Sequence, residues 1–188
     1  ICGDDKWRSF RREDFSTDII AISETHFQEG KTDRTYNDKY DGFFGDRTRV
    51  DQQRLQDIKG GCALWLKKEN CNNVDVLLQE NGDADLRFEA LCVTFTYEQK
   101  DFAVLVVYNP PGNSGYQRSR ANSRIVRRML EDTRELGILR ENCIVIGDFN
   151  RTTLGTYREL GCGHYDYSKR VSELDQIYGF NNIRPYRV

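Results

Sequence analysis

Five short apolar runs constrain the fold of this chain more than any other feature of its sequence. Each run is five to eight residues long and is bounded by polar or turn-forming residues. Runs of this length with little polar alternation are typical of β-strands that are covered on both faces. The predicted strands are residues 18–23, 61–66, 88–95, 102–108 and 143–147. A chain with this pattern is expected to fold around a core of β-sheet.

One amphipathic helix is predicted between the last two strands, at residues 116–136. Its apolar side chains recur near helical spacing, at Ile125, Met129, Leu130 and Leu136. Six arginines occupy other positions of this segment, and they would either contact phosphate groups or pair with acidic neighbours. The number of acidic residues in the same segment favours a solvated, ion-paired face.

Two stretches show no clear periodicity. Residues 28–59 and 69–85 are polar, and we expect both to be long surface loops. No repeat or linker divides the chain, and hydrophobic residues make up 38% of it, enough for one well-buried core. We therefore predict a single α/β domain over residues 1–188, with its sheet covered on both sides.

Charge and cysteine content narrow the class of protein. The formal net charge of −2 gives no overall basic field, so nucleic-acid binding would depend on local patches or on a metal ion that bridges phosphate. The six cysteines include no C-x-x-C pair, which argues against a zinc site and suits reduced thiols inside a cell. No stretch approaches the roughly 18 apolar residues of a membrane span. We expect an intracellular protein with no membrane partner.

Polar residues directly follow three of the predicted strands, at positions where α/β sheets often carry sites. The segments are Ser23-Glu24-Thr25, Tyr108-Asn109-Pro110-Pro111 and Gly147-Asp148-Phe149-Asn150. Asp148 and Asn150 are two apart, so in extended chain they would face one substrate together. An equally weighted alternative is a turn in which they cap their own backbone. Taken alone, Glu24 fits a solvated carboxylate and Tyr108 a core aromatic at least as well as functional groups.

Together and in this order, the segments resemble the endonuclease/exonuclease/phosphatase family of DNase I-like enzymes. The resemblance is nearest to the endonuclease domains of LINE-type non-LTR retrotransposons. Residues 18–25 resemble the family strand DIIALTET, residues 60–66 resemble GGVAIYV, and residues 107–111 resemble VYRPP. Residues 147–150 match the GDFN signature, and residues 172–177 are similar to the LDLI or IDYI strand. The resemblance implies a two-sheet β-sandwich flanked by helices, in four layers α/β/β/α.

The resemblance also implies a role for each of five residues. Glu24 would bind the divalent metal ion, Mg²⁺ or Mn²⁺, and Tyr108 would touch the scissile phosphate. Asp148 would act on the attacking water, and Asn150 would orient the phosphate. Asp175 would contact the active-site histidine of the family and orient it.

Two family motifs are not found in the sequence. The family opens with a strand that bears an asparagine, as in NARSL, and closes with Ser-Asp-His, and neither is present. We therefore expect a domain that is incomplete at both ends and poorly active or inactive by itself. His26 and His164 are the two histidines, and neither lies in a Ser-Asp-His context. We expect ordinary exposed or loop histidines at both positions rather than a replacement.

The implied activity is metal-dependent hydrolysis of a DNA phosphodiester that leaves a 3′-hydroxyl, as in retrotransposon target-site nicking. The expected partner is DNA, bound by a monomeric domain that would work in the nucleus, and the resemblance allows a reverse transcriptase domain in the same polypeptide. Two alternatives remain open: an inactive remnant of such a domain, and a phosphatase or phosphodiesterase of the same fold acting on another phosphoester. The combination of the Tyr108 and Asp148 motifs favours the nuclease.

Overall fold

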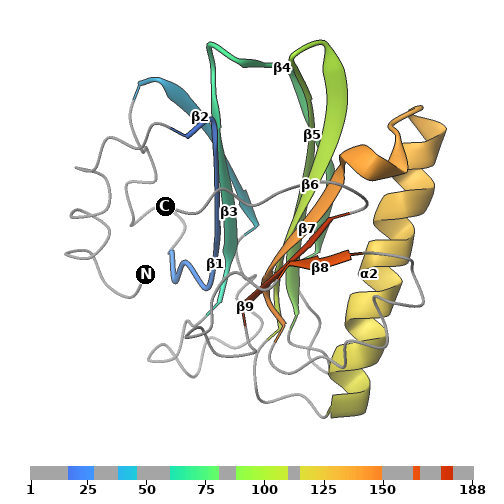
Figure 1. Cartoon of the computed structure of the whole chain (residues 1–188). Helices are drawn as coiled ribbons and strands as arrows, with labels where there is room; N and C mark the ends of the chain where they lie inside the picture. The colour runs from blue at the N-terminus through green and yellow to red at the C-terminus, as the bar shows by residue number, and fades with distance from the viewer. Residues whose placement is uncertain are drawn as a thin grey trace.

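The chain folds into two β-sheets packed face to face, with a long helix on the outer face of the larger sheet (Figure 1). The computed structural model describes residues 17–27, 38–45, 60–80, 88–109, 115–149, 163–165 and 175–179. The smaller sheet has the strand order β1-β3-β2 and the larger sheet the order β4-β5-β6-β7-β9-β8. These layers agree with the predicted two-sheet sandwich.

The smaller sheet is antiparallel throughout. Its strands are β1 (Ile19–Ser23), β2 (Tyr40–Gly45) and β3 (Cys62–Lys67). In the larger sheet β6 and β7 run parallel and the other neighbours run antiparallel. Its strands are β4 (Cys71–Glu80), β5 (Glu89–Tyr97), β6 (Lys100–Tyr108), β7 (Cys143–Asp148), β8 (Gly163–Tyr165) and β9 (Asp175–Gly179). The parallel pair requires a crossover, which α2 (Gly115–Glu135) and the 3-10 turn η1 (Arg140–Asn142) supply.

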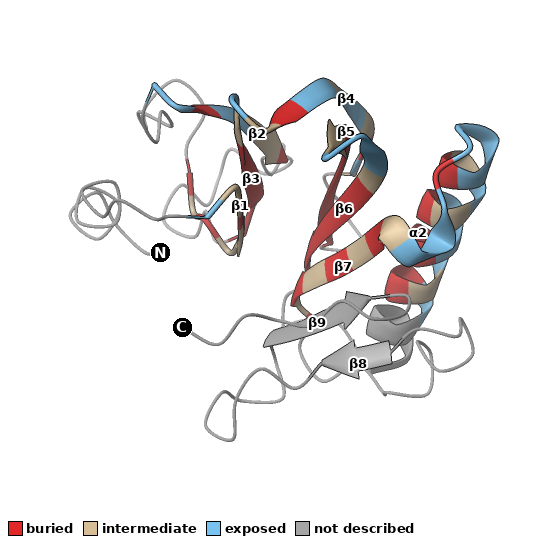
Figure 2. Ribbon diagram, turned by 45° about the horizontal axis from the view of Figure 1, so that its top comes forward, coloured by how far each residue is buried: buried red, intermediate tan, exposed pale blue. Residues whose placement is uncertain are grey.

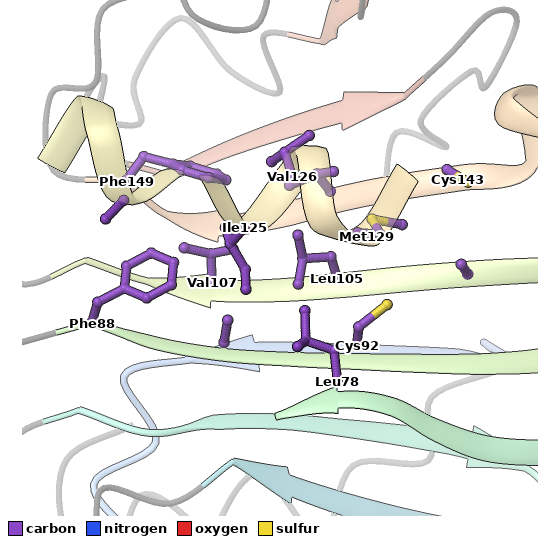
Figure 3. Packing of buried hydrophobic residues seen from close by; sticks show 14 of the residues in the cluster. Leu78, Phe88, Cys92, Leu105, Val107, Ile125, Val126, Met129, Cys143 and Phe149 are labelled. Carbon is purple, nitrogen blue, oxygen red and sulfur yellow. The ribbon is translucent and has the colours of Figure 1, made fainter. Parts of the chain in front are cut away.

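The central strands of the larger sheet are buried on both faces, because each face packs on a different layer. Alternate residues of β5, β6 and β7 face α2 and form one core with Ile125, Val126 and Met129 (Figure 3). The residues between them pack against Leu64 and Leu66 of β3 in a second core between the sheets. This double cover explains why the strands appear in the sequence as continuous apolar runs.

Helix α2 is amphipathic, and the face turned toward the sheet is buried while the opposite face is exposed (Figure 2). Arg124 and Arg128 both pair with Glu80 at the end of β4, at 2.7 and 3.0 Å. Arg128 also lies 3.7 Å from Asp132 one turn further along the helix. The prediction of an ion-paired face is confirmed for these two arginines.

The five predicted strands and the helix are confirmed, but the two predicted long loops are partly wrong. Residues 40–45 form β2 and residues 71–80 form β4. Strand β4 lies at the edge of its sheet, exposes polar side chains such as Asn72 and Asp75, and is interrupted by register shifts. An edge strand of this kind has no continuous apolar run to indicate it. None of the described helices is long and apolar enough to cross a membrane.

Candidate active site

Four residues with acidic or phenolic side chains occupy one row across the end of the larger sheet. Glu89 on β5 is the register partner of Tyr108 on β6, and Tyr108 is the register partner of Asp148 on β7. Asp175, the first residue of β9, is in turn the register partner of Asp148. Strand pairing alone therefore brings together positions that are up to 86 residues apart in the sequence.

Three residues of the row, Glu89, Tyr108 and Asp148, face the space between the two sheets. Tyr108 belongs to the core that the sheets share. Side chains alternate along a strand, so Glu89 shares the face of Leu91, and Asp148 shares the face of Ile146, which packs on that same core. Glu89 is wholly buried, whereas Asp148 is partly exposed. These three side chains thus lie at one end of an otherwise apolar interface.

Glu24 reaches the row from the opposite sheet, just beyond the end of β1. The hydroxyl of Tyr108 donates a hydrogen bond to Oε1 of Glu24 over 3.2 Å. Nε2 of His26 lies 3.3 Å from the same oxygen. The Glu24 side chain is 43% exposed, while that of His26 is 14% exposed. The carboxylate is therefore fixed on its inner side and open to solvent on its outer side.

The pKa of the Tyr108 hydroxyl reflects its burial and the acidic groups around it. Burial raises the pKa of the Tyr108 hydroxyl well above its usual range, and the charge of Glu24 and the hydrogen bond to it raise that pKa further. The charges of Glu89 and Asp148 act in the same direction. The hydroxyl therefore stays protonated as a donor, beside three carboxylate groups whose charge favours a cation nearby.

The end of the site next to α2 is held by buried amide groups. The backbone N–H of Asn109 donates to the carbonyl oxygen of Asp148 over 2.9 Å, which extends the pairing of β6 and β7 by one residue. The side chain of Asn109 donates to Oδ1 of Asn122 on the helix over 3.1 Å, and both asparagines are fully buried. Such satisfied buried contacts fix the strand ends that carry Tyr108 and Asp148.

The donor set suits a divalent ion that is held by few protein groups. Among the described residues, no group of three or more His, Cys, Asp or Glu side chains is arranged as a metal cage. Mg²⁺ is commonly held by one or two carboxylates together with water and substrate phosphate rather than by such a cage. A solvent-facing Glu24 beside further acidic charge fits that mode of binding. The residues present therefore fit the ion that the resemblance implies.

Residues 8–187 match the Endonuclease/Exonuclease/phosphatase family. The chain belongs to this family. Members of the family hydrolyse phosphoesters and typically use divalent metal ions. None of the curated proteins compared with the chain is similar enough in sequence to count as a match.

Solved structures of this endonuclease/exonuclease/phosphatase family share the fold. The catalytic domain of human Nocturnin is 17% identical, with a TM-score of 0.62 over 87% of this chain and 69% of Nocturnin. A mannosyl-6-phosphatase from Bacteroides thetaiotaomicron is 16% identical, with a TM-score of 0.58 over 87% of this chain and 71% of its own. The endonuclease domain of the telomere-specific non-LTR retrotransposon TRAS1 is 14% identical over 87% and 72%, and its TM-score of 0.47 is too low to support an argument.

The structure brings together three of the five predicted site residues through their side chains: Glu24, Tyr108 and Asp148. Asp175 is placed beside Asp148 by strand register, and its backbone position is the only part of it described. Asn150 lies outside the described residues. His164 falls in β8.

Two residues of the site were not expected from the sequence. Glu89 lies within a run of apolar residues, and a charged residue that interrupts such a run is a signal because carboxylates are rarely buried without a partner or a function. His26 lies in a loop as expected, but its side chain is mostly buried against Glu24 instead of exposed. No local sequence pattern predicts that contact, because it depends on an unusual backbone turn at residues 24–26.

Proposed function

We propose that this member of the family is a divalent-metal-dependent endonuclease that hydrolyses DNA phosphodiester bonds, as in retrotransposon target-site nicking. The observation that carries the proposal is the convergence of Glu24 and Asp148, from opposite sheets, on the hydroxyl of Tyr108. The Tyr108 and Asp148 motifs together resemble the retrotransposon branch, which favours DNA over other phosphoesters. A reverse transcriptase domain in the same polypeptide and a nuclear location belong to the same proposal.

In this proposal each side chain has a separate task. Glu24 would hold Mg²⁺ or Mn²⁺, which would polarise a phosphoryl oxygen and stabilise the charge of the leaving oxygen. Asp148 would orient a water molecule and accept its proton as the water adds to phosphorus. The bond from phosphorus to O3′ would then break, and the leaving oxygen would take a proton from solvent, which gives a 3′-hydroxyl and a 5′-phosphate. The protonated hydroxyl of Tyr108 would donate a hydrogen bond to the phosphate in the transition state.

Two roles in the proposal rest on the family resemblance alone. Asn150 would orient the phosphate, and Asp175 would support a catalytic histidine. The 188-residue sequence contains no Ser-Asp-His motif, so a second protein form that carries the two missing family segments is needed for a complete test. Without a histidine donor the rate is expected to be lower by about 10²- to 10³-fold.

The proposal is tested by Mg²⁺-dependent nicking of supercoiled plasmid. We would compare the 188-residue chain with a form extended by an Asn-bearing first strand and a Ser-Asp-His segment. Asp148→Ala and the isosteric Asp148→Asn are made in both forms. Asp41→Asn is the matched control, because Asp41 is an exposed acid that pairs with Lys68 at the opposite end of the smaller sheet.

Nicking that requires Mg²⁺, survives Asp41→Asn and is lost in both Asp148 variants would support the endonuclease. A folded extended form that does not nick DNA would contradict it. The same preparation is then offered a soluble phosphomonoester and a phosphodiester other than DNA. Turnover of one of these, dependent on Asp148, would reassign the site to another phosphoester.

A further inference from the structure

We infer that His26 is a positioning residue that fixes the carboxylate of Glu24 for binding of the divalent ion. This inference rests on the proposed function, because it takes Glu24 as the metal ligand. The two contacts described above both reach Oε1 of Glu24, from Tyr108 at 3.2 Å and from His26 at 3.3 Å. Side chains that hydrogen-bond to a metal-binding carboxylate orient it and raise the affinity of the site for its ion.

The two contacts approach that oxygen from different layers of the protein. Tyr108 belongs to the larger sheet, whereas His26 lies in the loop that follows the smaller sheet's β1. A glutamate side chain loses up to about 2 kcal/mol of conformational freedom when it is fixed. Two donors already in place would offset that cost before an ion binds, which is the physical basis of preorganisation.

The backbone of the loop is shaped to place residues 24 and 26 together. Both have left-handed backbone angles, with φ of 56° at Glu24 and 55° at His26. For residues other than glycine this conformation costs on the order of 1 kcal/mol or more each, and it persists where surrounding contacts enforce it. The N–H groups of Thr25 and His26 donate to the carbonyl oxygens of Gly61 and Gly60 over 3.2 and 2.8 Å.

A side chain at either glycine would disturb the site. A Cβ at Gly60 would lie 2.7 Å from Oε2 of the buried Glu89, and a Cβ at Gly61 would lie 2.5 Å from Oγ1 of Thr25. Both glycines also have positive φ angles, of 123° and 93°. The turn at residues 24–26 therefore packs against Gly60 and Gly61, and Gly60 lies against Glu89 of the row. The strained backbone is that of the proposed ligand Glu24 and of His26.

The burial of the imidazole indicates positioning rather than catalysis. The His26 side chain is 14% exposed, against 43% for Glu24, so the carboxylate is the more accessible of the two groups to an ion from solvent. Nε2 can donate to Oε1 in the neutral Nε2–H tautomer as well as in the charged form. The contact therefore requires no particular protonation state.

The test measures Mn²⁺ affinity by electron paramagnetic resonance, together with the unfolding temperature of each variant. His26→Phe keeps the ring volume and removes the donor, and His26→Gln keeps a donor at about the reach of Nε2. Glu24→Gln identifies the site. Gln99→Ala is the matched control for the backbone, because Gln99 has a left-handed φ of 62° in the exposed β5–β6 turn.

We expect His26→Phe to weaken Mn²⁺ binding by about 10-fold or more. His26→Gln should restore most of the affinity at a similar unfolding temperature, and Gln99→Ala should leave it unchanged. Equal Mn²⁺ affinity in His26→Phe and the unsubstituted protein, with loss in Glu24→Gln, would overturn this inference and leave the proposed function standing. Absence of Mn²⁺ binding in the unsubstituted protein, or full binding in Glu24→Gln, would overturn both.

Discussion

The hydroxyl of Tyr108 lies 3.2 Å from Oε1 of Glu24, although the two residues are 84 positions apart in the sequence. A second contact of the same kind joins the sheets at the other end of β1, where the hydroxyl of Tyr97 donates to Oδ2 of Asp18 over 2.9 Å. Strand β1 thus has an acid at each end, and each acid accepts a hydrogen bond from a tyrosine of the larger sheet. One of these contacts belongs to the site, and the other lies far from it.

Tyr108→Phe should lower the nicking activity far more than it lowers the stability of the fold. The buried ring is kept, so the free energy of unfolding should fall by no more than about 1.5 kcal/mol. Nicking should fall by about 10²-fold, because a preorganised donor to the phosphate is lost. Steady-state nicking and urea denaturation measure the two effects. Tyr97→Phe is the matched control and should leave nicking unchanged; equal losses of nicking in both variants would contradict the role of Tyr108.

Gly147→Ala should strongly destabilise the fold. Gly147 has a φ of 145°, and a Cβ there would overlap the backbone of Val107 on the neighbouring strand. Because the atoms in the way are backbone atoms, β6 and β7 would have to separate next to Tyr108 and Asp148. We expect a loss of at least about 3 kcal/mol in the free energy of unfolding.

Gly137→Ala is the comparison for that variant. Gly137 also has a positive φ, of 76°, but nothing lies within 4 Å of the position of its Cβ. It should cost only about 1 kcal/mol. Thermal unfolding of both proteins would show the difference, and a well-folded Gly147→Ala with the same stability as Gly137→Ala would show that the strand ends tolerate a wider spacing.

The interior strands could be predicted from the sequence because burial on both faces leaves a continuous apolar signature. Strands β3, β5, β6 and β7 have it, and so does the edge strand β1, because its alternate side chains pack on the core between the sheets and on the core of the smaller sheet. Strands β2 and β4 are also edge strands, but unlike β1 they expose residues within the strand, such as Asp41 in β2 and Asp75 in β4, so neither forms a continuous apolar run. In β4 the left-handed Asn73 and the register shifts also break the alternation that would otherwise indicate a strand.

The positions of some site residues could likewise be predicted from the sequence, whereas their contacts depend on the fold. Glu24, Tyr108 and Asp148 each follow or end an apolar run, so their positions at strand ends could be predicted. That they meet depends on the packing of one sheet on the other, which no local pattern encodes. The contribution of His26 depends on two left-handed residues that are not glycine, and residue identity does not predict that conformation.

Asp18→Ala should destabilise the fold while leaving the site unchanged. Asp18 accepts hydrogen bonds from the side chains of Asn70, over 2.7 Å, and Tyr97, and lies 3.6 Å from Nζ of Lys67. Removing an acceptor that serves two donors should cost about 1–3 kcal/mol in the free energy of unfolding. Mn²⁺ affinity should not change, because Glu24 is at the other end of β1. A Mn²⁺ affinity that falls with stability would show that the two ends of β1 are coupled.

The stability of the protein should fall as the pH rises above about 8.5, the usual pKa of a thiol in an unfolded chain. Burial, followed by the charge of Asp18, raises the pKa of Cys71 in the folded protein to about 11. Between these two values the folded chain holds a proton on Cys71 that the unfolded chain has released. The folded state therefore binds more protons, and the free energy of unfolding must decrease as the pH increases.

Burial also raises the pKa of Cys62, so part of the decrease will remain when Cys71 is removed. Urea denaturation at about pH 8 and about pH 10.5 measures the decrease, and Cys71→Ala should make it smaller. Cys71→Ala will also lower stability at both pH values because a buried side chain is truncated, so the difference between the two pH values is the quantity to compare. An identical difference in the two proteins would show that the Cys71 thiol ionises in the folded protein as readily as in the unfolded chain.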